Sequence, residues 1–352
     1  MQDVPGATHE ELTMAEHLVV AQPVDDDGLR RVRDLAGGAR IDIVAPYGAG
    51  DRLPDELART ATVLFADQCP AGVEDLTALR WLQLGSAGYA QLAGQPLRPD
   101  VAVTNASGVN DVPIAEWCLL MMLTFRRRFP TMLAEQRARR WNRDAAFQAE
   151  LRGSRVGFVG YGNVGQEAAR LARLAGLEIW TLTRSAPGPR TGRFDPFDRP
   201  ESDWPEPDRA FGFDQRADFY AGLDYLVVAT PSTSSTQGLV DAAALAALPS
   251  HAVLLNPARA QVVDEPALRD ALVSGAIAGA ALDTHYRSPL DPADPTWDLP
   301  NVVVTPHISG STGSTYFRPR LWELFGRNLA RHLAGEPLLN LIPTAELELG
   351  RR

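Results

Sequence analysis

The segment Leu151–Ser185 constrains the fold of this chain more than any other part of the sequence. It predicts an apolar strand at Val156–Val159, a glycine-rich turn, an amphipathic helix and a second strand at Glu178–Thr183. The glycines of the turn have the spacing G-x-G-x-x-G and are Gly160, Gly162 and Gly165.

This spacing has a physical reason in dinucleotide-binding proteins. The first glycine permits the tight turn, the second lets backbone amides approach a pyrophosphate, and the third lets the helix pack closely on the strand. The N-terminus of the helix then offers unpaired N–H groups to the phosphates. An ordinary strand-to-helix turn can carry the same spacing, but the flanking strand and helix favour a dinucleotide site.

The end of the second strand indicates which dinucleotide is bound. An NAD site usually has an acidic residue about 20 positions after the glycines, which binds the ribose 2′-hydroxyl. Here that region reads Thr183-Arg184-Ser185, with no carboxylate. Because the guanidinium of Arg184 suits a phosphate, we expect NADP(H) to be preferred over NAD(H).

Composition excludes several classes of function. The chain has 352 residues, which is long enough for two domains, and 45% of them are hydrophobic. Its net charge of −10 argues against nucleic acid as a partner. All 34 basic residues are arginine, which excludes lysine Schiff-base chemistry.

The compartment follows from the cysteines and the N-terminus. Cys69 and Cys118 lack the spacing of metal ligands, so we expect no metal site and a buried thiol at Cys118. The first 16 residues are polar and acidic, unlike a signal peptide. No run reaches the about 18 apolar residues that span a bilayer. We therefore expect a cytoplasmic protein with no membrane partner.

The rest of the chain alternates strand and helix signals, which predicts an α/β fold with two parallel, doubly wound sheets. One apolar helix is predicted at Ile114–Phe129, ending before Pro130. Residues 186–212 contain six prolines and many charges, which predicts an exposed insertion with few apolar anchors. The strands predicted outside the glycine segment are residues 17–22, 41–45, 63–66, 81–84, 101–104, 223–229, 252–256, 278–283 and 302–306.

Three polar residues follow successive strands of the second half of the chain. Arg259 lies in the segment N-P-A-R, Asp283 ends the segment G-A-A-L-D, and His307 lies in T-P-H-I. Ligands of open parallel sheets bind beyond the carboxyl ends of the strands. We therefore expect these three side chains to converge beside the cofactor.

With these motifs, in this order, the chain resembles the D-isomer-specific 2-hydroxyacid dehydrogenase family. The resemblance runs from about residue 17 to 337 and includes the segments 85–88 and 105–116. It implies a nucleotide domain, residues 112–308, inserted into a discontinuous substrate domain, residues 1–111 and 309–352. It also implies a homodimer and a small-molecule substrate, a 2-oxo acid or D-2-hydroxy acid.

The resemblance further implies roles for individual residues. Arg259 would bind the substrate carboxylate and polarise the carbonyl, and His307 would be the general acid. The backbone amides of Ser86, Ala87 and Gly88 would bind the same carboxylate. The full set of expected cofactor-binding residues is Gly160, Gly162, Asn163, Val164, Gly165, Thr183, Arg184, Ser185, Pro231, Thr236, Ala258 and Asp283. In that set Asp283 would bind the nicotinamide carboxamide.

One departure from the family pattern concerns the partner of His307. The family has a glutamate before the proline of this region, whereas here the sequence reads Ser288-Pro289. A carboxylate would favour the protonated ring, but a serine brings no charge. Asp291 would replace the carboxylate if its loop folded back.

The same departure leaves two alternative functions open. Formate dehydrogenases, a branch of the family, also lack this glutamate, because formate has no hydroxyl to deprotonate. A cofactor-binding protein with little turnover is the other alternative, although such a protein has no need of both Arg259 and His307.

Overall fold

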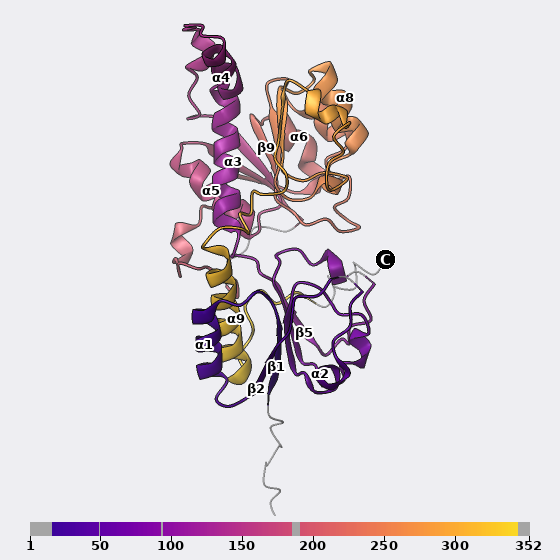
Figure 1. Ribbon diagram of the computed structural model, residues 1–352. Coiled ribbons are helices and arrows are strands. Elements are labelled where there is room, and N and C mark those ends of the chain that lie inside the picture. Colours follow the sequence, from indigo (N-terminus) through magenta and orange to yellow (C-terminus); the bar gives the residue numbers. More distant parts are fainter. Residues whose placement is uncertain (1–15, 49, 93, 185–190, 344–352) are drawn as a thin grey trace, which may run out of the picture.

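The fold consists of two parallel α/β units, a five-stranded unit and a seven-stranded unit (Figure 1). The computed structural model describes residues 16–48, 50–92, 94–184 and 191–343. Every strand pairs with its neighbours in parallel, which confirms the predicted fold class.

The five-stranded sheet has the order β2-β1-β3-β4-β5. Its strands are short and largely buried, because helices cover both faces, as parallel sheets require. Their bounds are β1 His17–Ala21, β2 Arg40–Ile43, β3 Val63–Ala66, β4 Trp81–Leu84 and β5 Ala102–Thr104. The helices of this unit are α1 Asp26–Leu35, α2 Asp55–Thr60 and α9 Phe317–Leu333.

The seven-stranded sheet has the order β12-β11-β10-β9-β6-β7-β8. The chain runs outward from β6 to β8 and then returns to the other side of β6 at β9, so the strand order reverses between β6 and β9. Ligands of doubly wound sheets bind at such a point. The strand bounds are β6 Arg155–Val159, β7 Glu178–Leu182, β8 Arg209–Phe211, β9 Tyr225–Val228, β10 Val253–Asn256, β11 Gly279–Leu282 and β12 Val302–Val304.

Four helices belong to the seven-stranded unit besides the α3–α4 pair described below. They are α5 Asn163–Leu174, α6 Arg216–Ala221, α7 Ala242–Ala247 and α8 Glu265–Ser274.

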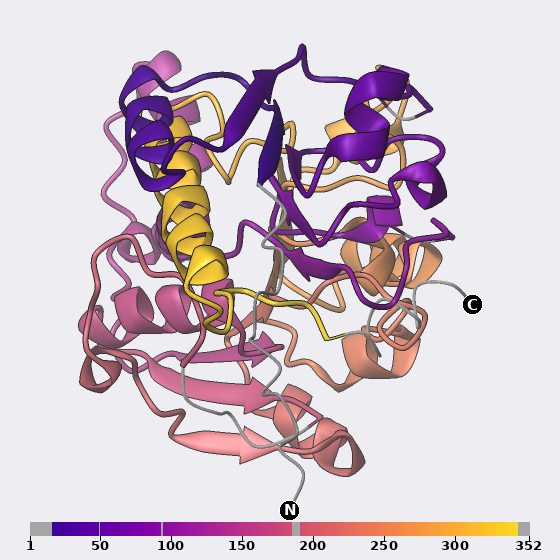
Figure 2. The ribbon, with the colours of Figure 1, turned by 90° about the horizontal axis from the view of Figure 1, so that it is seen from below.

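Helix α9, near the end of the chain, packs beside α1 on the five-stranded sheet (Figure 2). Its Trp322 and Phe325 are buried, and the ring of Phe325 stacks on Phe65 of β3 at 4.3 Å between centroids. Aromatic side chains of this size contribute much of a core's stability. The last helix therefore completes the hydrophobic core that the first strands begin.

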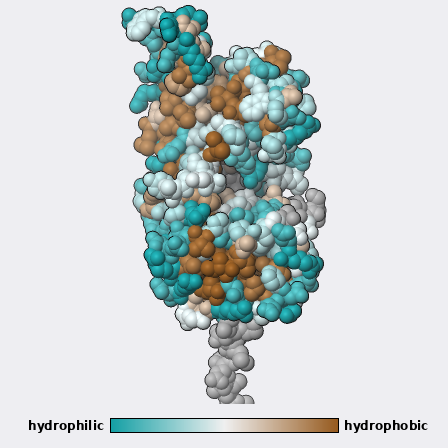
Figure 3. All heavy atoms as spheres, in the orientation of Figure 1, coloured by the Kyte–Doolittle hydropathy of each residue, from teal (hydrophilic) through white to brown (hydrophobic). Residues whose placement is uncertain are grey.

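The helix predicted at Ile114–Phe129 is present and ends before Pro130, but both of its bounds lie three residues earlier. It is α3, Asp111–Arg126, and a second helix, α4 Phe129–Arg137, contains Pro130 in its first turn. A proline is tolerated there because the first N–H groups of a helix have no partner within it. The two helices form a projecting column (Figure 1), and hydrophobic residues reach the surface along it (Figure 3).

In the described part of the predicted insertion, residues 191–212, most residues are exposed or half-buried, but a few apolar side chains are buried. Phe194 is completely buried, Trp204 is 8% exposed, and residues 209–211 form β8. The apolar residues of this segment are few, but they are placed in cores. A count of prolines and charges could not show this, because burial depends on what each side chain meets in space.

Candidate active site

The glycine-rich turn connects β6 to α5 at the point where the strand order reverses. Gly160 has a φ of +87°, and a Cβ atom there would lie 2.8 Å from the carbonyl oxygen of Ala229. A Cβ at Gly165 would lie 2.9 Å from the carbonyl oxygen of Gly160, so the helix packs against the turn. A Cβ at Gly162 would meet nothing within 4 Å. The space beside Gly162 lets a ligand approach the backbone.

The N-terminus of α5 faces this space with free donors. No side chain caps the helix at Gly162. The Nδ2 atom of Asn163 is buried and has no hydrogen-bond partner among the described residues. Unpaired donors at a helix N-terminus bind anions, and Val164 and Gly165 lie in the same first turn. The arrangement fits the pyrophosphate of a dinucleotide.

Thr183 and Arg184 follow β7, next to the glycine turn. The amide of Thr183 donates to the carbonyl of Phe211 at 3.1 Å, which connects it to β8. Arg184 is exposed and forms no ion pair in the described part of the chain. The predicted Ser185 lies outside the described residues.

Two further predicted loops lie at the same edge of the sheet. After β9, the hydroxyl of Thr236 donates to the carbonyl of Pro231 at 2.6 Å and accepts from the amide of Thr233 at 2.8 Å. After β10, the amide of Ala258 donates to the Oδ1 atom of Asn256 at 3.1 Å. Pro231, Thr236 and Ala258 are therefore held in ordered turns beside the glycine loop.

The loop Ser86–Gly88 follows β4 of the five-stranded unit. Its carbonyl groups accept hydrogen bonds: Ala87 from Asn105 Nδ2 at 2.8 Å and Gly88 from the Ser86 hydroxyl at 2.8 Å. The amides of Ser86, Ala87 and Gly88 have no acceptor among the described residues. Three N–H groups without a described acceptor in one ordered loop are suited to bind an anion as their partner.

Arg259 reaches this loop from the seven-stranded unit. A Cβ atom at Gly88 would lie only 2.5 Å from its Nη2 atom. The guanidinium forms no ion pair with any described carboxylate, and burial lowers its pKa below the usual range. Its backbone is fixed by Asn256, whose Nδ2 donates to the Arg259 carbonyl at 3.0 Å. A half-buried cation without a counter-ion and free amides thus meet across the two units.

Asp283 is completely buried at the end of β11, and its carboxylate holds the loop that carries His307. Oδ1 accepts from the Thr305 hydroxyl at 2.6 Å and from the Ile308 amide at 2.9 Å, and Oδ2 accepts from the Ser309 amide at 2.9 Å. The expected contact with nicotinamide stays a prediction. The described contacts of Asp283 are those of a residue that positions His307.

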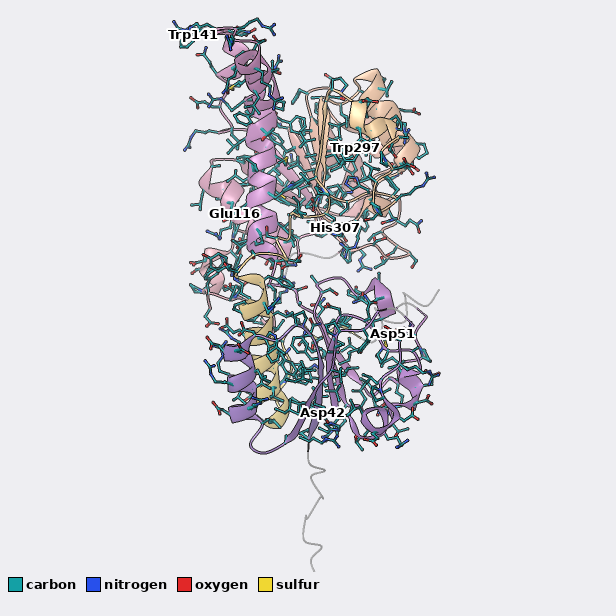
Figure 4. All side chains as sticks on the ribbon, in the orientation of Figure 1. Asp42, Asp51, Glu116, Trp141, Trp297 and His307 are labelled. Carbon is teal, nitrogen blue, oxygen red and sulfur yellow. The ribbon has the colours of Figure 1, made fainter. Side chains whose placement is uncertain are left out.

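His307 is exposed and has a φ of +56°, a conformation that residues other than glycine rarely adopt (Figure 4). Such backbone costs about 1–3 kcal/mol and persists only where the surroundings impose it. The bonds from Asp283 to Thr305, Ile308 and Ser309 surround His307 on both sides in the chain. They are the described contacts that impose it.

The structure does not give His307 a carboxylate partner. Its ring forms no hydrogen bond or ion pair with the residues that the structure describes, Ser288 included. Asp291 instead accepts from the Ala293 amide at 2.8 Å and, through its carbonyl, from Trp297 Nε1 at 3.0 Å. The suggestion that Asp291 folds back to His307 therefore finds no support in these contacts.

Sequence reasoning missed the residues that fix the site without facing the ligand. Asn105, Asn256 and Thr305 hold the loops of Ala87, Arg259 and Asp283, respectively. Asn105 and Thr305 directly follow a strand and Asn256 is the last residue of β10, and this position at a strand end is a signal in the sequence. Many other polar residues share that position, so the signal alone does not select these three.

Within residues 16–343, gaps excepted, no group of three or more His, Cys, Asp or Glu side chains is arranged to hold a metal ion. None of the helices in the described ranges has the length and apolar character that a membrane crossing needs.

The two parallel sheets and the glycine-rich turn are those of a dinucleotide-binding α/β protein. The chain belongs to the D-isomer specific 2-hydroxyacid dehydrogenase family, because the model of that family's NAD binding domain matches residues 119–309. A glyoxylate reductase of Thermococcus kodakarensis is 31% identical over 261 residues, 71% of this chain and 72% of that protein.

Other relatives are longer than this chain. A D-3-phosphoglycerate dehydrogenase of Bacillus subtilis is 34% identical over 303 residues, 84% of this chain and 53% of that protein. The chain thus spans about half the length of that relative. Among solved structures, a D-isomer specific 2-hydroxyacid dehydrogenase from Xanthobacter autotrophicus Py2, in complex with NADPH and MES, has a TM-score of 0.78 and 29% identity. The match covers 95% of this chain and all of that one.

Proposed function

We propose that this protein reduces a small 2-oxo acid to a D-2-hydroxy acid with NADP(H). The observation that carries the proposal is the meeting of Arg259 with the free amides of Ser86–Gly88. Unpaired donors around a half-buried cation suit a substrate carboxylate, which accepts several charge-assisted hydrogen bonds.

Within this site, each residue has one task. Arg259 binds the carboxylate and polarises the neighbouring carbonyl, and the amides of residues 86–88 fix the orientation of the acid. His307 donates the proton to the carbonyl oxygen. The nicotinamide cofactor supplies the hydride.

The cofactor site fits NADP(H) better than NAD(H). The amide-rich start of α5 suits the pyrophosphate, and Arg184, which has no ion pair with a described residue, provides a cation at the end of β7, where a 2′-phosphate would lie. A family member from Xanthobacter autotrophicus Py2 was solved with NADPH. Residues 112–308 would form the nucleotide domain, and residues 1–111 and 309–352 the substrate domain.

The test is NADPH oxidation with glyoxylate, hydroxypyruvate and 3-phosphohydroxypyruvate. We expect turnover with at least one of them, and Arg259→Ala should lower kcat/KM by about 100-fold, the value of a lost charge-assisted contact. Arg287→Ala is the matched control, because Arg287 is an exposed arginine elsewhere in the seven-stranded unit. Absence of turnover with all three acids, or full activity of Arg259→Ala, would contradict the proposal.

Oxidation of formate is the second candidate, because His307 has no carboxylate partner among the described residues. An acid–base pair is unnecessary when the substrate has no hydroxyl. Reduction of NADP⁺ or NAD⁺ by formate, without turnover of any 2-oxo acid, would select this candidate. Ser288→Glu should then bring no gain, whereas in a 2-oxo acid reductase it should raise the rate at alkaline pH.

We also propose that the protein is a homodimer, with the α3–α4 column as the interface. Leu120 and Phe129 on this column are 56% and 49% exposed, and Trp141 beyond α4 is 92% exposed (Figure 4). Large exposed apolar side chains on one projecting element indicate a protein interface. Light scattering should give twice the chain mass for the wild type and the single mass for Leu120→Glu/Trp141→Ala.

A further inference from the structure

Residues 191–205, here called the strap, have no part in the proposed chemistry but contact both units. The strap follows the end of β7 in the seven-stranded unit, passes the five-stranded unit and returns toward β8. Ordering this segment costs conformational entropy, which its contacts with the two units must offset.

One end of the strap is anchored in the five-stranded unit. Phe194 is completely buried in the same core cluster as Val109 and Trp322. Four residues after Phe194, Asp198 forms an ion pair with Arg327 of α9, with 3.0 Å between Nη2 and Oδ2. Both contacts join the strap to the five-stranded unit, although the strands before and after the strap, β7 and β8, belong to the seven-stranded unit.

Asn340 connects the strap to Ser86–Gly88, here called the substrate loop. Its Oδ1 atom accepts from the amide of Phe194 at 3.0 Å, and its amide donates to the carbonyl of Gly192 at 2.8 Å. Its Nδ2 atom donates to the carbonyl of Asn105 at 3.1 Å, and Asn105 in turn donates to Ala87 at 2.8 Å. Two asparagines thus link the strap to the loop that Arg259 contacts at Gly88.

The other end of the strap is anchored at the glycine-rich turn, residues 160–165, here called the glycine loop. Arg199 forms an ion pair at 2.9 Å with Glu167 of α5, a carboxylate that is completely buried. The hydroxyl of Tyr161, between Gly160 and Gly162, donates to the carbonyl of Pro205 at 2.7 Å. The strap therefore contacts the glycine turn and the helix that follows it.

We propose that the strap is a positioning element that holds the glycine loop and the substrate loop in fixed relative positions before any ligand binds. The identity of the substrate in this inference rests on the proposed function. Arg259 belongs to one unit and Ser86–Gly88 to the other, so rotation between the units would separate the two halves of the carboxylate site. Contacts that restrict this rotation lower KM, because the substrate need not order the site on binding.

The kinetic test weakens one anchor without touching the site. Asp198→Asn removes the charge that Arg327 binds, and asparagine tolerates the φ of +48° at this position. We expect KM for glyoxylate to rise about two- to fivefold, the value of one partly exposed ion pair, with kcat and the Kd for NADPH nearly unchanged. Arg327→Ala should have a similar effect, and the double variant should be no worse than the single ones.

The matched control is Arg331→Ala, one turn further along α9. Arg331 is exposed to a similar degree, 36% against 31% for Arg327, but pairs with Glu336 in its own unit. Its KM should equal that of the wild type. An unchanged KM in Asp198→Asn and Arg327→Ala, or an equal rise in Arg331→Ala, would overturn the inference.

A second measurement needs no substrate and separates this inference from the proposed function. The amide of Ala106 donates to the carbonyl of Ser86 at 2.9 Å, so its hydrogen exchange reports on the substrate loop. Asp198→Asn should accelerate this exchange and increase the radius of gyration, whereas Arg331→Ala should do neither. If the wild type reduces no 2-oxo acid but the exchange rate and the radius of gyration change as expected, the proposed function is wrong and the role of the strap is retained. If neither quantity changes in Asp198→Asn, the role of the strap is refuted, whatever the enzyme reduces.

Discussion

The guanidinium of Arg259 lies against the backbone of Gly88, so closely that a Cβ atom on Gly88 would be 2.5 Å from Nη2. The two residues are 171 positions apart and belong to different sheets. Their contact places the positive charge of Arg259 directly beside the loop whose amides have no acceptor among the described residues.

This contact predicts the effect of Gly88→Ala. The φ of Gly88 is not positive, so the backbone accepts alanine, and the new methyl group would displace the flexible end of Arg259. We expect KM for the 2-oxo acid to rise about tenfold with little change in melting temperature, because a small displacement of a positioning charge costs binding and not folding. Gly313→Ala is the control, since a Cβ there meets nothing within 4 Å. Equal KM values for the two variants would contradict the placement of Arg259.

Arg184 should determine the choice of cofactor. Arg184→Ala removes the cation expected to bind the 2′-phosphate, and kcat/KM for NADPH should fall about 10- to 100-fold, the value of charge-assisted hydrogen bonds. The value for NADH should change less than twofold. Arg31→Ala, on the exposed side of α1, should leave both values unchanged. If the wild type has the same kcat/KM for NADH as for NADPH, the proposed role of Arg184 in binding the 2′-phosphate is refuted.

Thr305 should affect the rate of catalysis by positioning Asp283, and not by contacting the ligand. Thr305→Val removes the hydroxyl that donates to the buried Asp283 carboxylate at 2.6 Å, whereas Thr305→Ser keeps it. A hydrogen bond to a charged group contributes about 1.5–3 kcal/mol, so the valine variant should lose stability and about tenfold in kcat as the His307 loop loosens. The Kd for NADPH, measured by fluorescence, should stay constant. Equal kcat values for valine and serine would show that the hydroxyl does not position His307.

Glu16 should make the stability of the five-stranded unit dependent on pH. Burial opposes its ionisation, but hydrogen bonds from His332 and Thr62 and the charge of Arg80 outweigh burial and lower the pKa of the carboxyl from 4.5 to about 2. Because the folded pKa is the lower one, the stabilisation is complete above about pH 4.5 and is lost as the pH falls to about 2.

Glu16→Gln tests this dependence by chemical denaturation. At pH 7 the variant should be less stable by about 1–2 kcal/mol, a value reduced for solvent screening. The difference should vanish as the pH approaches about 2, the pKa of the folded state. Glu56→Gln, an exposed residue of α2, should track the wild type at every pH. A constant difference across the titration would assign the effect of Glu16 to packing.

Local patterns predicted most strands, because an apolar run between turn residues indicates a buried parallel strand without further information. The strands 63–66 and 81–84 have the predicted bounds. Element bounds were less accurate where a residue has two structural meanings. The helix predicted to end at Phe129, before Pro130, ends at Arg126, and Pro130 lies in the first turn of α4, because proline suits both the end of one helix and the start of the next.

The candidate site divides in the same way. Gly160, Gly162 and Gly165 were predicted from their spacing, since each glycine serves the turn that contains it. Asp283 was correctly placed at a strand end, but its three bonds to the His307 loop could not be read from the sequence. Which lone pairs of a carboxylate are occupied depends on the path of a loop that begins 22 residues later.

The sequence by itself determined the α/β class, the dinucleotide turn and the residue types of the site, because these depend on periodicity and on short spacings. Only the tertiary structure decided which residues meet between the two units: Arg259 with Gly88, and the strap with Asn340. Such contacts join residues more than 100 positions apart. They arise from how two sheets and their connecting segments pack, and no local pattern in one sequence encodes that packing.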